Sequence, residues 1–282
     1  MPRPLLVAAL LLASCAAFRT PQAELAIAEQ EIGGGDPVRG VRRMERAMGL
    51  LRVADPMQWN RLGETAATAD PELAQRAFAR AEELRWPDAS PSNAVRLTPP
   101  FTGRWLVTQG NRGAYSHGRL PDRFAWDFQM VDERGEASRD GSERMTGFYC
   151  FGAPVLATAD GVVEIVEEGL PDNMDGVRNL RDPGGNVVTL RHSAGELSRF
   201  CHLQCGSITV KPGQIVRRGE VIGRCGCSGN AALPHLHFVL RVGPTWRDTS
   251  IPARFEGLRI LRDGAPVPGG VPEAGDIVIA GE

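Results

Sequence analysis

The chain has 282 residues and a formal net charge of −2 at pH 7, and charged residues make up 23% of it. Such a balanced charge provides no basic surface for a polyanion, so we expect no nucleic-acid partner. There are only five histidines and none precedes residue 117, so any histidine chemistry belongs to the chain from that position onward.

The first 15 residues combine a short basic start, an apolar run and a cysteine. After a short basic start, the apolar run 5–13 is too brief to span a bilayer core of about 30 Å. Leu12-Ala13-Ser14-Cys15 is similar to a lipobox, which implies that Cys15 is lipidated, and Ala16 in place of aspartate implies the outer membrane. We therefore expect an exported envelope protein anchored to the periplasmic face of the membrane through Cys15. An ordinary secretory signal is the alternative.

Residues 20–86 are rich in Ala, Glu and Arg and are predicted to be helical. They repeat with a period of 34 residues, which aligns Asp36-Pro37 with Asp70-Pro71. This period, together with Trp59-x-x-Leu62-Gly63, resembles tetratricopeptide repeats, each of which is a helix-turn-helix. An Asp-Pro pair suits the start of a helix, with aspartate as the N-cap and proline in the first turn.

Two such repeats are fewer than the three or so that a stable solenoid usually needs. We therefore expect residues 20–86 to pack on another surface, either the remainder of this chain or a protein partner in the envelope. A helical spacer without a partner is the alternative.

Residues 87–100 are rich in proline, serine and asparagine and are predicted to form a linker. In 101–245, short apolar runs are interrupted by Gly, Pro, Asn and Asp, which indicates an all-β domain. Residues 246–282 are predicted to add a short β extension that carries no chemistry. The fold class is therefore α+β, with helical hairpins followed by a predominantly antiparallel β domain.

The tripeptide His235-Leu236-His237 begins a predicted strand that continues into Phe238-Val239-Leu240. Side chains alternate along a strand, so the two imidazoles share one face, with their Cα atoms about 6.6 Å apart. A histidine pair of this kind is weak evidence by itself, because two polar residues on a solvated strand face give the same pattern.

A carboxylate and a third histidine strengthen the pattern. Residues 124–130 alternate between apolar and polar side chains, which places Asp127 opposite the aromatic face of a predicted strand. His117 lies ten residues earlier, in a turn-like setting. Two imidazoles and one carboxylate are a typical ligand set for a catalytic zinc ion. A remaining histidine of the pair, together with His202, would be available for proton transfer or for stabilising an oxyanion.

These segments resemble the lysostaphin-type zinc endopeptidases, also called LytM-type peptidases, over roughly residues 100–245. The matching segments stand in the expected order, and they include Ser116-His117, Ala125-Trp126-Asp127-Phe128, Asp160-Gly161-Val162-Val163, Gly185-Asn186-Val187-Val188, Cys201-His202-Leu203, Cys225-Gly226-Cys227-Ser228-Gly229-Asn230 and Pro234-His235-Leu236-His237-Phe238.

The resemblance implies that His117, Asp127 and His237 hold Zn2+ and that His202 and His235 are the catalytic pair beside it. The commonest family pattern has three residues between the first histidine and the aspartate, whereas nine intervene here. Asp122 lies in this longer gap and is a rival ligand. We favour Asp127 because it lies on the alternating strand, whereas the sequence around Asp122 indicates a turn with a solvated charge.

The family and the expected compartment imply an endopeptidase that hydrolyses peptide cross-links of bacterial peptidoglycan. The alternative is a non-catalytic LytM-like regulator that binds and activates another cell-wall hydrolase. Degenerate domains of that kind usually lack ligands, whereas all five positions are filled here, which favours the enzyme.

If the protein is exported, we expect the remaining cysteines to form disulfides, because an oxidising compartment favours them. The sequence does not determine how they pair. They are Cys150, Cys201, Cys205, Cys225 and Cys227. A structural zinc site formed by Cys225, Cys227, His235 and His237 is a second hypothesis, but it leaves His117 and Asp127 unexplained. His192 ends a predicted strand and is expected to be structural.

Overall fold

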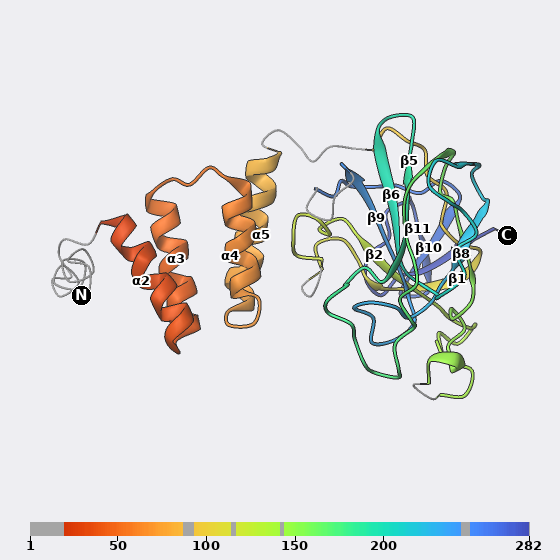
Figure 1. Cartoon of the computed structure of the whole chain (residues 1–282), viewed down its shortest axis with the longest axis horizontal. Coiled ribbons are helices and arrows are strands. Elements are labelled where there is room, and N and C mark those ends of the chain that lie inside the picture. The colour runs from red at the N-terminus through yellow and green to blue at the C-terminus, as the bar shows by residue number, and fades with distance from the viewer. Residues whose placement is uncertain (1–19, 87–92, 114–116, 142–143, 244–248, 282) are drawn as a thin grey trace. The chain divides into compact units, whose positions relative to one another are not determined.

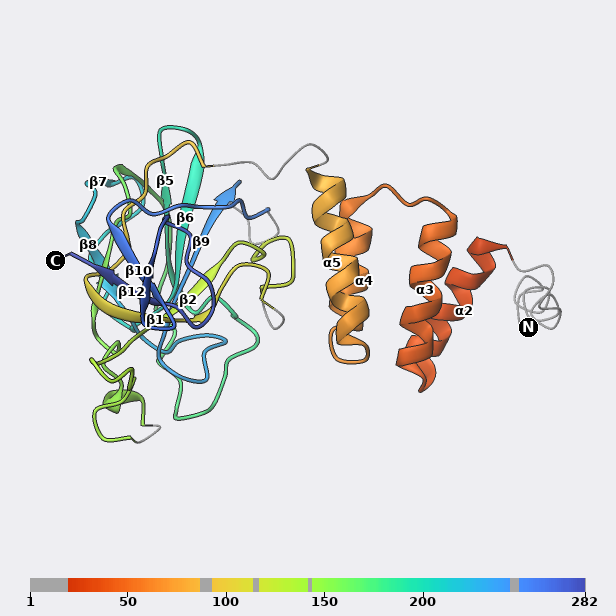
Figure 2. The ribbon, with the colours of Figure 1, turned by 180° about the vertical axis from the view of Figure 1, so that it is seen from behind.

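The computed structural model describes residues 20–86, 93–113, 117–141, 144–243 and 249–281. The chain divides into a helical unit, Met1–Ala89, and a β-rich unit, Ser90–Glu282 (Figures 1 and 2). The predicted signal and Cys15 lie outside the described residues. No helix in the described part of the chain is both long and apolar enough to cross a membrane.

Four helices follow one another in residues 20–86, as predicted, and form two hairpins, α2 with α3 and α4 with α5. Every helix has a proline in its first turn and a capping side chain that accepts a hydrogen bond from a backbone N–H. The caps are Thr20, Asp36, Asp55 and Asp70, and the helices span Pro21–Gly34, Pro37–Leu50, Pro56–Ala66 and Pro71–Arg85. These caps stop each helix from extending backwards and so fix the hairpins.

The second hairpin packs closely where a glycine meets an aromatic ring. A Cβ atom added to Gly63 of α4 would lie 2.5 Å from a ring carbon of Phe78, which is buried on α5. Glycine therefore permits the two helices to approach at this point. Gly49 on α3 has nothing within 4 Å of the same hypothetical atom, so it provides a matched comparison.

We expect Gly63→Ala to make the helical unit less stable than Gly49→Ala does, by about 1–3 kcal/mol, because only the first substitution overpacks a core. Both variants gain up to about 1 kcal/mol of helix propensity, so this gain cancels in the comparison. Urea unfolding followed by circular dichroism at 222 nm measures the difference. Equal stability of the two variants would show that the contact between Gly63 and Phe78 is not restrictive.

The β-rich unit contains a ten-stranded sheet in the order β11-β10-β12-β1-β2-β9-β6-β5-β4-β7, in which all pairs are antiparallel, and a two-stranded sheet of β3 with β8. The strands are β1 Gly103–Gln109, β2 Trp126–Met130, β3 Pro154–Leu156, β4 Gly161–Glu167, β5 Asn186–Arg191, β6 Glu196–Leu203, β7 Ile215–Val216, β8 Val221–Arg224, β9 Leu236–Val242, β10 Leu258–Arg262, β11 Ala265–Val267 and β12 Ile277–Ala280. This confirms the predicted α+β class.

Two segments outside the predicted β domain are built into this unit. Residues 258–280 supply β10, β11 and β12, and β12 pairs with β1 inside the large sheet. The end of the predicted linker also joins the unit, because Ala94 and Val95 donate backbone hydrogen bonds of 2.7 and 2.8 Å to the carboxylate of Glu196. Leu97 is fully buried. The β-rich unit therefore uses more of the chain than the strand pattern of 101–245.

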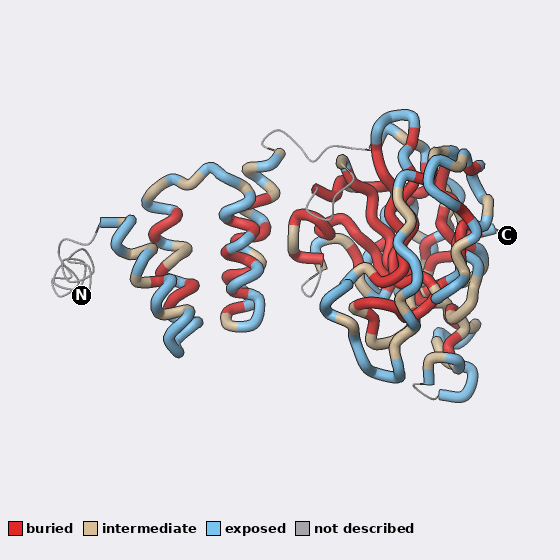
Figure 3. The backbone as a smooth tube through the Cα atoms, viewed as in Figure 1, coloured by how far each residue is buried: buried red, intermediate tan, exposed pale blue. Residues whose placement is uncertain are grey.

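An aromatic core supports the central strands β2, β9 and β6, and the tube is buried along β6 and most of β9 (Figure 3). The rings of Trp126 and Phe238 stack with their centroids 6.4 Å apart, and Phe255 packs 5.3 Å from Trp126 and 5.4 Å from Phe238. Because side chains alternate along a strand, anchoring this face orients the residues between them, including Asp127 and His237, toward the opposite face.

Candidate metal centre

The register of two neighbouring strands brings Asp127 and His237 together. Asp127 of β2 and His237 of β9 are direct partners in the antiparallel ladder, so their side chains share a face. His237 Nδ1 lies 2.8 Å from Asp127 Oδ1. Residues 110 positions apart in sequence therefore meet through strand pairing.

His117 joins them from the segment between β1 and β2. Its side chain is fully buried, and its Nε2 lies 3.4 Å from Asp127 Oδ1. One ligand-type atom from each of His117, Asp127 and His237 lies within 4.8 Å of the other two, which makes a group that could hold a metal ion. The structure thus brings together the three residues predicted from sequence.

The donor set fits a metal ion. His117 Nδ1 lies 3.0 Å from the Gly110 carbonyl, which only accepts hydrogen bonds, so Nδ1 carries the proton in the neutral ring and Nε2 has the lone pair. That Nε2 is buried and has no hydrogen-bond partner among the described residues. A buried imidazole nitrogen with an available lone pair beside a carboxylate is suited to bind a metal ion.

A neighbouring amide orients the carboxylate. Gln109 Nε2 donates a 2.8 Å hydrogen bond to Asp127 Oδ2, which leaves Oδ1 facing the three histidines around it. Burial by itself would raise the pKa of Asp127, but His117 and His235 hold it well below its usual range. The carboxylate is therefore an anion at neutral pH, as a metal ligand must be.

The electrostatics of His237 follow from two carboxylates. Burial opposes its charged form, but contacts with Asp122 and Asp127 raise the pKa of His237 to about 10. At neutral pH this ring therefore carries a proton on each nitrogen. A metal ion that binds one nitrogen would release the proton from that nitrogen.

The predicted catalytic pair lies beside this group. The rings of His202 and His235 have centroids 4.6 Å apart, and His202 lies 5.8 Å from His237 by the same measure. His235 Nε2 is 3.7 Å from Asp127 Oδ1. All five predicted site residues therefore gather in one place.

A β-bulge in β6 directs the side chain of His202 toward His235. Asn186 pairs with Leu203 and Val188 pairs with Phe200, so β6 has one more residue than β5 between these pairs. His202 lies in this bulge with φ at +61°. Cys201 pairs directly with His237, so their side chains share a face. In a regular strand the side chain of His202 would lie on the opposite face. The bulge re-aims the side chain, which is a common use of bulges next to active sites.

Backbone carbonyls also fix which nitrogen of each catalytic histidine is available. His202 Nδ1 lies 2.8 Å from the Ser228 carbonyl, and His235 Nδ1 lies 2.9 Å from the Leu233 carbonyl. In the neutral rings Nε2 is therefore the basic atom of each. Burial, followed by the charges of His235 and His237, lowers the pKa of His202 well below its ordinary value, so this ring is neutral.

The remaining sequence candidates lie elsewhere or act differently. Asp122 is in a turn, as predicted, but its charge is not solvated: the residue is 8% exposed and binds Arg119 and Arg241. That expectation was wrong because a turn's exposure depends on distant partners, here an arginine of β9. Both ring nitrogens of His192 are occupied, by Asp160 O and Ser198 Oγ, as expected for a structural residue.

The five cysteines in the described residues are free thiols, so the expected disulfides are not present. Burial, followed by contact with Cys150, raises the pKa of Cys225, and burial raises that of Cys227 to about 12. Thiols in such surroundings rarely ionise to the thiolate that disulfide exchange requires. Among the described residues, the side chains placed so that they could hold a metal ion are those of His117, Asp127 and His237. The alternative set of two cysteines and two histidines does not form such a site there.

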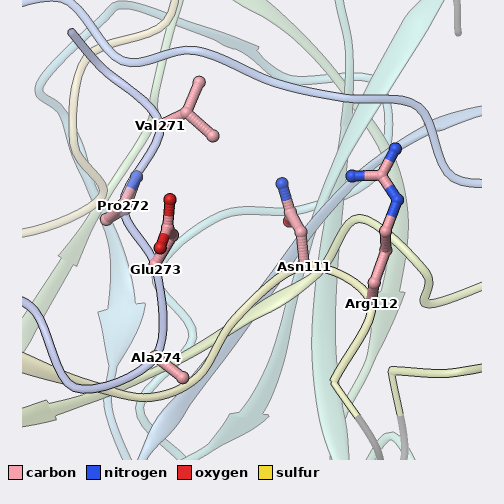
Figure 4. A pocket seen from close by; sticks show the side chains of 6 residues that line it. All are labelled: Asn111, Arg112, Val271, Pro272, Glu273 and Ala274. Carbon is pink, nitrogen blue, oxygen red and sulfur yellow. The ribbon is translucent and has the colours of Figure 1, made fainter.

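A separate cavity of about 430 Å³ lies between residues 111–112 and residues 271–274 (Figure 4). Its lining residues are Asn111, Arg112, Val271, Pro272, Glu273 and Ala274. None of the five predicted site residues lines it, so this cavity is not the metal centre.

Residues 146–249 match the model of Peptidase family M23. The matched segment contains His202, His235 and His237, whereas His117 and Asp127 precede it. The match supports an M23-type domain, the lysostaphin and LytM type, in the β-rich unit. The tetratricopeptide and lipoprotein resemblances remain predictions.

Curated relatives are similar over part of the chain. The cell division protein DipM of Caulobacter vibrioides is 34% identical over 163 residues, which is 55% of this chain and 24% of that protein. The peptidoglycan DD-endopeptidase ShyB of Vibrio cholerae is 35% identical over 92 residues, which is 33% of this chain and 18% of that protein. The chain thus spans about a quarter or less of the length of these relatives.

Among solved structures, the catalytic domain of the antimicrobial peptidase lysostaphin from Staphylococcus simulans aligns with 54% of this chain and 88% of its own length. The sequence identity is 21% and the TM-score is 0.34.

Proposed function

We propose that this M23-type protein is a zinc-dependent endopeptidase that hydrolyses peptide cross-links in bacterial peptidoglycan. The observation that supports it most is the convergence of His117, Asp127 and His237 beside the pair His202 and His235. The substrate class is supported by relatives named peptidoglycan DD-endopeptidases.

His117, Asp127 and His237 would hold the zinc ion, the first through Nε2, which is buried and lacks a partner among the described residues. When bound, zinc supplies a water nucleophile near neutral pH and polarises the scissile carbonyl. Gln109 and the Gly110 carbonyl would orient two of these ligands toward the ion.

The catalytic pair would move the protons. Its two Nε2 atoms carry lone pairs, because the Nδ1 atoms face the carbonyls of Ser228 and Leu233. One neutral ring accepts a proton from the attacking water and returns it to the leaving amine. The other ring, when it carries a second proton taken from bulk solvent on Nε2, donates a hydrogen bond to the developing oxyanion. The centroids of the two rings lie 4.6 Å apart, so both rings are close enough to act on the same substrate group.

Digestion of purified sacculi tests the proposal. The purified protein should release uncross-linked muropeptides that mass spectrometry identifies, a chelator should suppress release, and added Zn2+ should restore it. The His237→Ala variant is the matched control and should release none. Hydrolysis that continues at full rate in the chelator would contradict a metal-dependent reaction.

The alternative is a non-catalytic envelope regulator, a reading for which the relative named a cell division protein is relevant. A zinc-loaded protein that releases no muropeptides but increases the activity of another cell-wall hydrolase would favour it. The five filled positions favour the enzyme.

We also propose that the protein is exported and anchored to the periplasmic face of the outer membrane through lipidated Cys15. The helical unit would then carry tetratricopeptide-like hairpins that bind an envelope protein. Anchoring would hold the enzyme next to its peptidoglycan substrate.

A further inference from the structure

Asp122 lies in the nine-residue interval that separates His117 from Asp127. The interval is an ordered turn: Asp122 N donates to Arg119 O at 3.0 Å, and Asp122 O accepts from Ala125 N at 2.9 Å. The turn carries an acidic side chain into the interior, where an unpaired charge would be costly.

Two arginines hold the carboxylate of Asp122 from different elements. Arg241 Nη2 lies 2.5 Å from Oδ1, and Arg119 Nη2 lies 3.0 Å from Oδ2. Arg241 is on β9, four residues after His237, so strand alternation places both on the same face. These two guanidinium groups compensate the charge of the buried carboxylate, so Asp122 is held as an anion.

This anion faces the ring nitrogen of His237 that does not contact Asp127. His237 Nε2 lies 3.7 Å from Asp122 Oδ1, while His237 Nδ1 lies 2.8 Å from Asp127 Oδ1. A histidine that binds a metal through one nitrogen keeps its proton on the other. Since Nδ1 faces Asp127, that proton belongs on Nε2 and points toward Asp122.

We propose that Asp122 is a positioning residue that accepts the Nε2–H of His237 and thereby presents Nδ1 to the metal. The inference rests on the proposed zinc function. Carboxylates that fix a metal-binding histidine in this way set its ring orientation and raise its basicity. The 3.7 Å gap is longer than a hydrogen bond, so the contact forms by a small rotation of the ring or through one bridging water.

The test is zinc affinity, measured on the whole 282-residue chain by competition with a chromophoric chelator. Asp122→Asn should weaken zinc binding by about 10- to 100-fold. Asp160→Asn is the matched control, since Asp160 is also paired with an arginine, Arg217 at 3.1 Å, but is exposed. It should leave the affinity unchanged.

Nitrogen-15 NMR of the zinc-loaded wild type provides a readout that does not depend on the variant folding. His237 should carry a proton on Nε2 that exchanges slowly with water. A His237 protonated on Nδ1 in the zinc-loaded wild type would overturn the proposal.

Asp122 could act by positioning His237 or only by stabilising its own loop. The variant Arg241→Gln distinguishes these roles, because it removes an ion pair of Asp122 but keeps the carboxylate. It should weaken zinc binding less than Asp122→Asn does, and equal weakening would assign Asp122 to loop support instead. A wild type that binds no zinc would defeat the proposed function itself. A wild type that binds zinc and hydrolyses sacculi, with Asp122→Asn equally tight, would defeat only this inference.

Discussion

Replacing Asp127 or His237 by alanine is expected to abolish zinc binding and peptidoglycan hydrolysis together. Each substitution removes one of three side chains whose ligand atoms lie within 4.8 Å of one another. The zinc affinity should fall by more than the roughly 100-fold that marks the upper end for outer partners of metal ligands. Zinc content per purified chain, measured by atomic absorption, and muropeptide release provide the two readouts.

His192→Gln is a suitable control for these variants, because His192 is buried and its two ring nitrogens are hydrogen-bonded to the Asp160 carbonyl and to Ser198 Oγ. It should retain zinc. Full zinc occupancy in the Asp127 variant, combined with loss of zinc in an Asp122 variant, would exchange the roles that we assign to the two aspartates.

His202→Ala should differ from these variants, because it should retain zinc but lose turnover. The ring of His202 lies near His235 and His237 but is not part of the metal-type group. Loss of a positioned acid–base group lowers the rate by about 100- to 10,000-fold. The measurement is kcat on a soluble cross-linked muropeptide, at a zinc content equal to that of the wild type.

Two variants at this position separate chemistry from backbone strain. His202 has φ at +61°, a conformation that asparagine tolerates better than alanine does. His202→Asn should therefore fold at least as well as His202→Ala and be equally slow. If His202→Asn recovers most of the rate, the defect of the alanine variant is conformational and His202 transfers no proton.

Local pattern was sufficient to predict part of this structure. Alternation in 124–130 and 235–240 gave the faces of β2 and β9. Asp-Pro pairs gave the starts of α3 and α5, because capping depends only on neighbouring residues. The choice of Asp127 over Asp122 also followed from alternation, whereas the roles of His202 and His235 came from the family resemblance.

Other features depend on partners that no local pattern reveals. The pairing of β2 with β9 in the register that sets Asp127 opposite His237 is a long-range choice. The bulge at His202 exists only relative to β5. Asp122 was expected to be solvated because its turn is polar, and only Arg241, 119 positions later, explains its burial.

The pairing of β12 with β1 has a consequence for where this protein can be shortened. Trimming the chain at the end of the family match, residue 249, would remove β12 and leave β1 with an open backbone edge. Exposed edges recruit strands from other molecules and promote aggregation. β1 is adjacent to the strand that carries Asp127. The final thirty or so residues contain no predicted catalytic group, but we expect their removal to promote aggregation through the edge of β1.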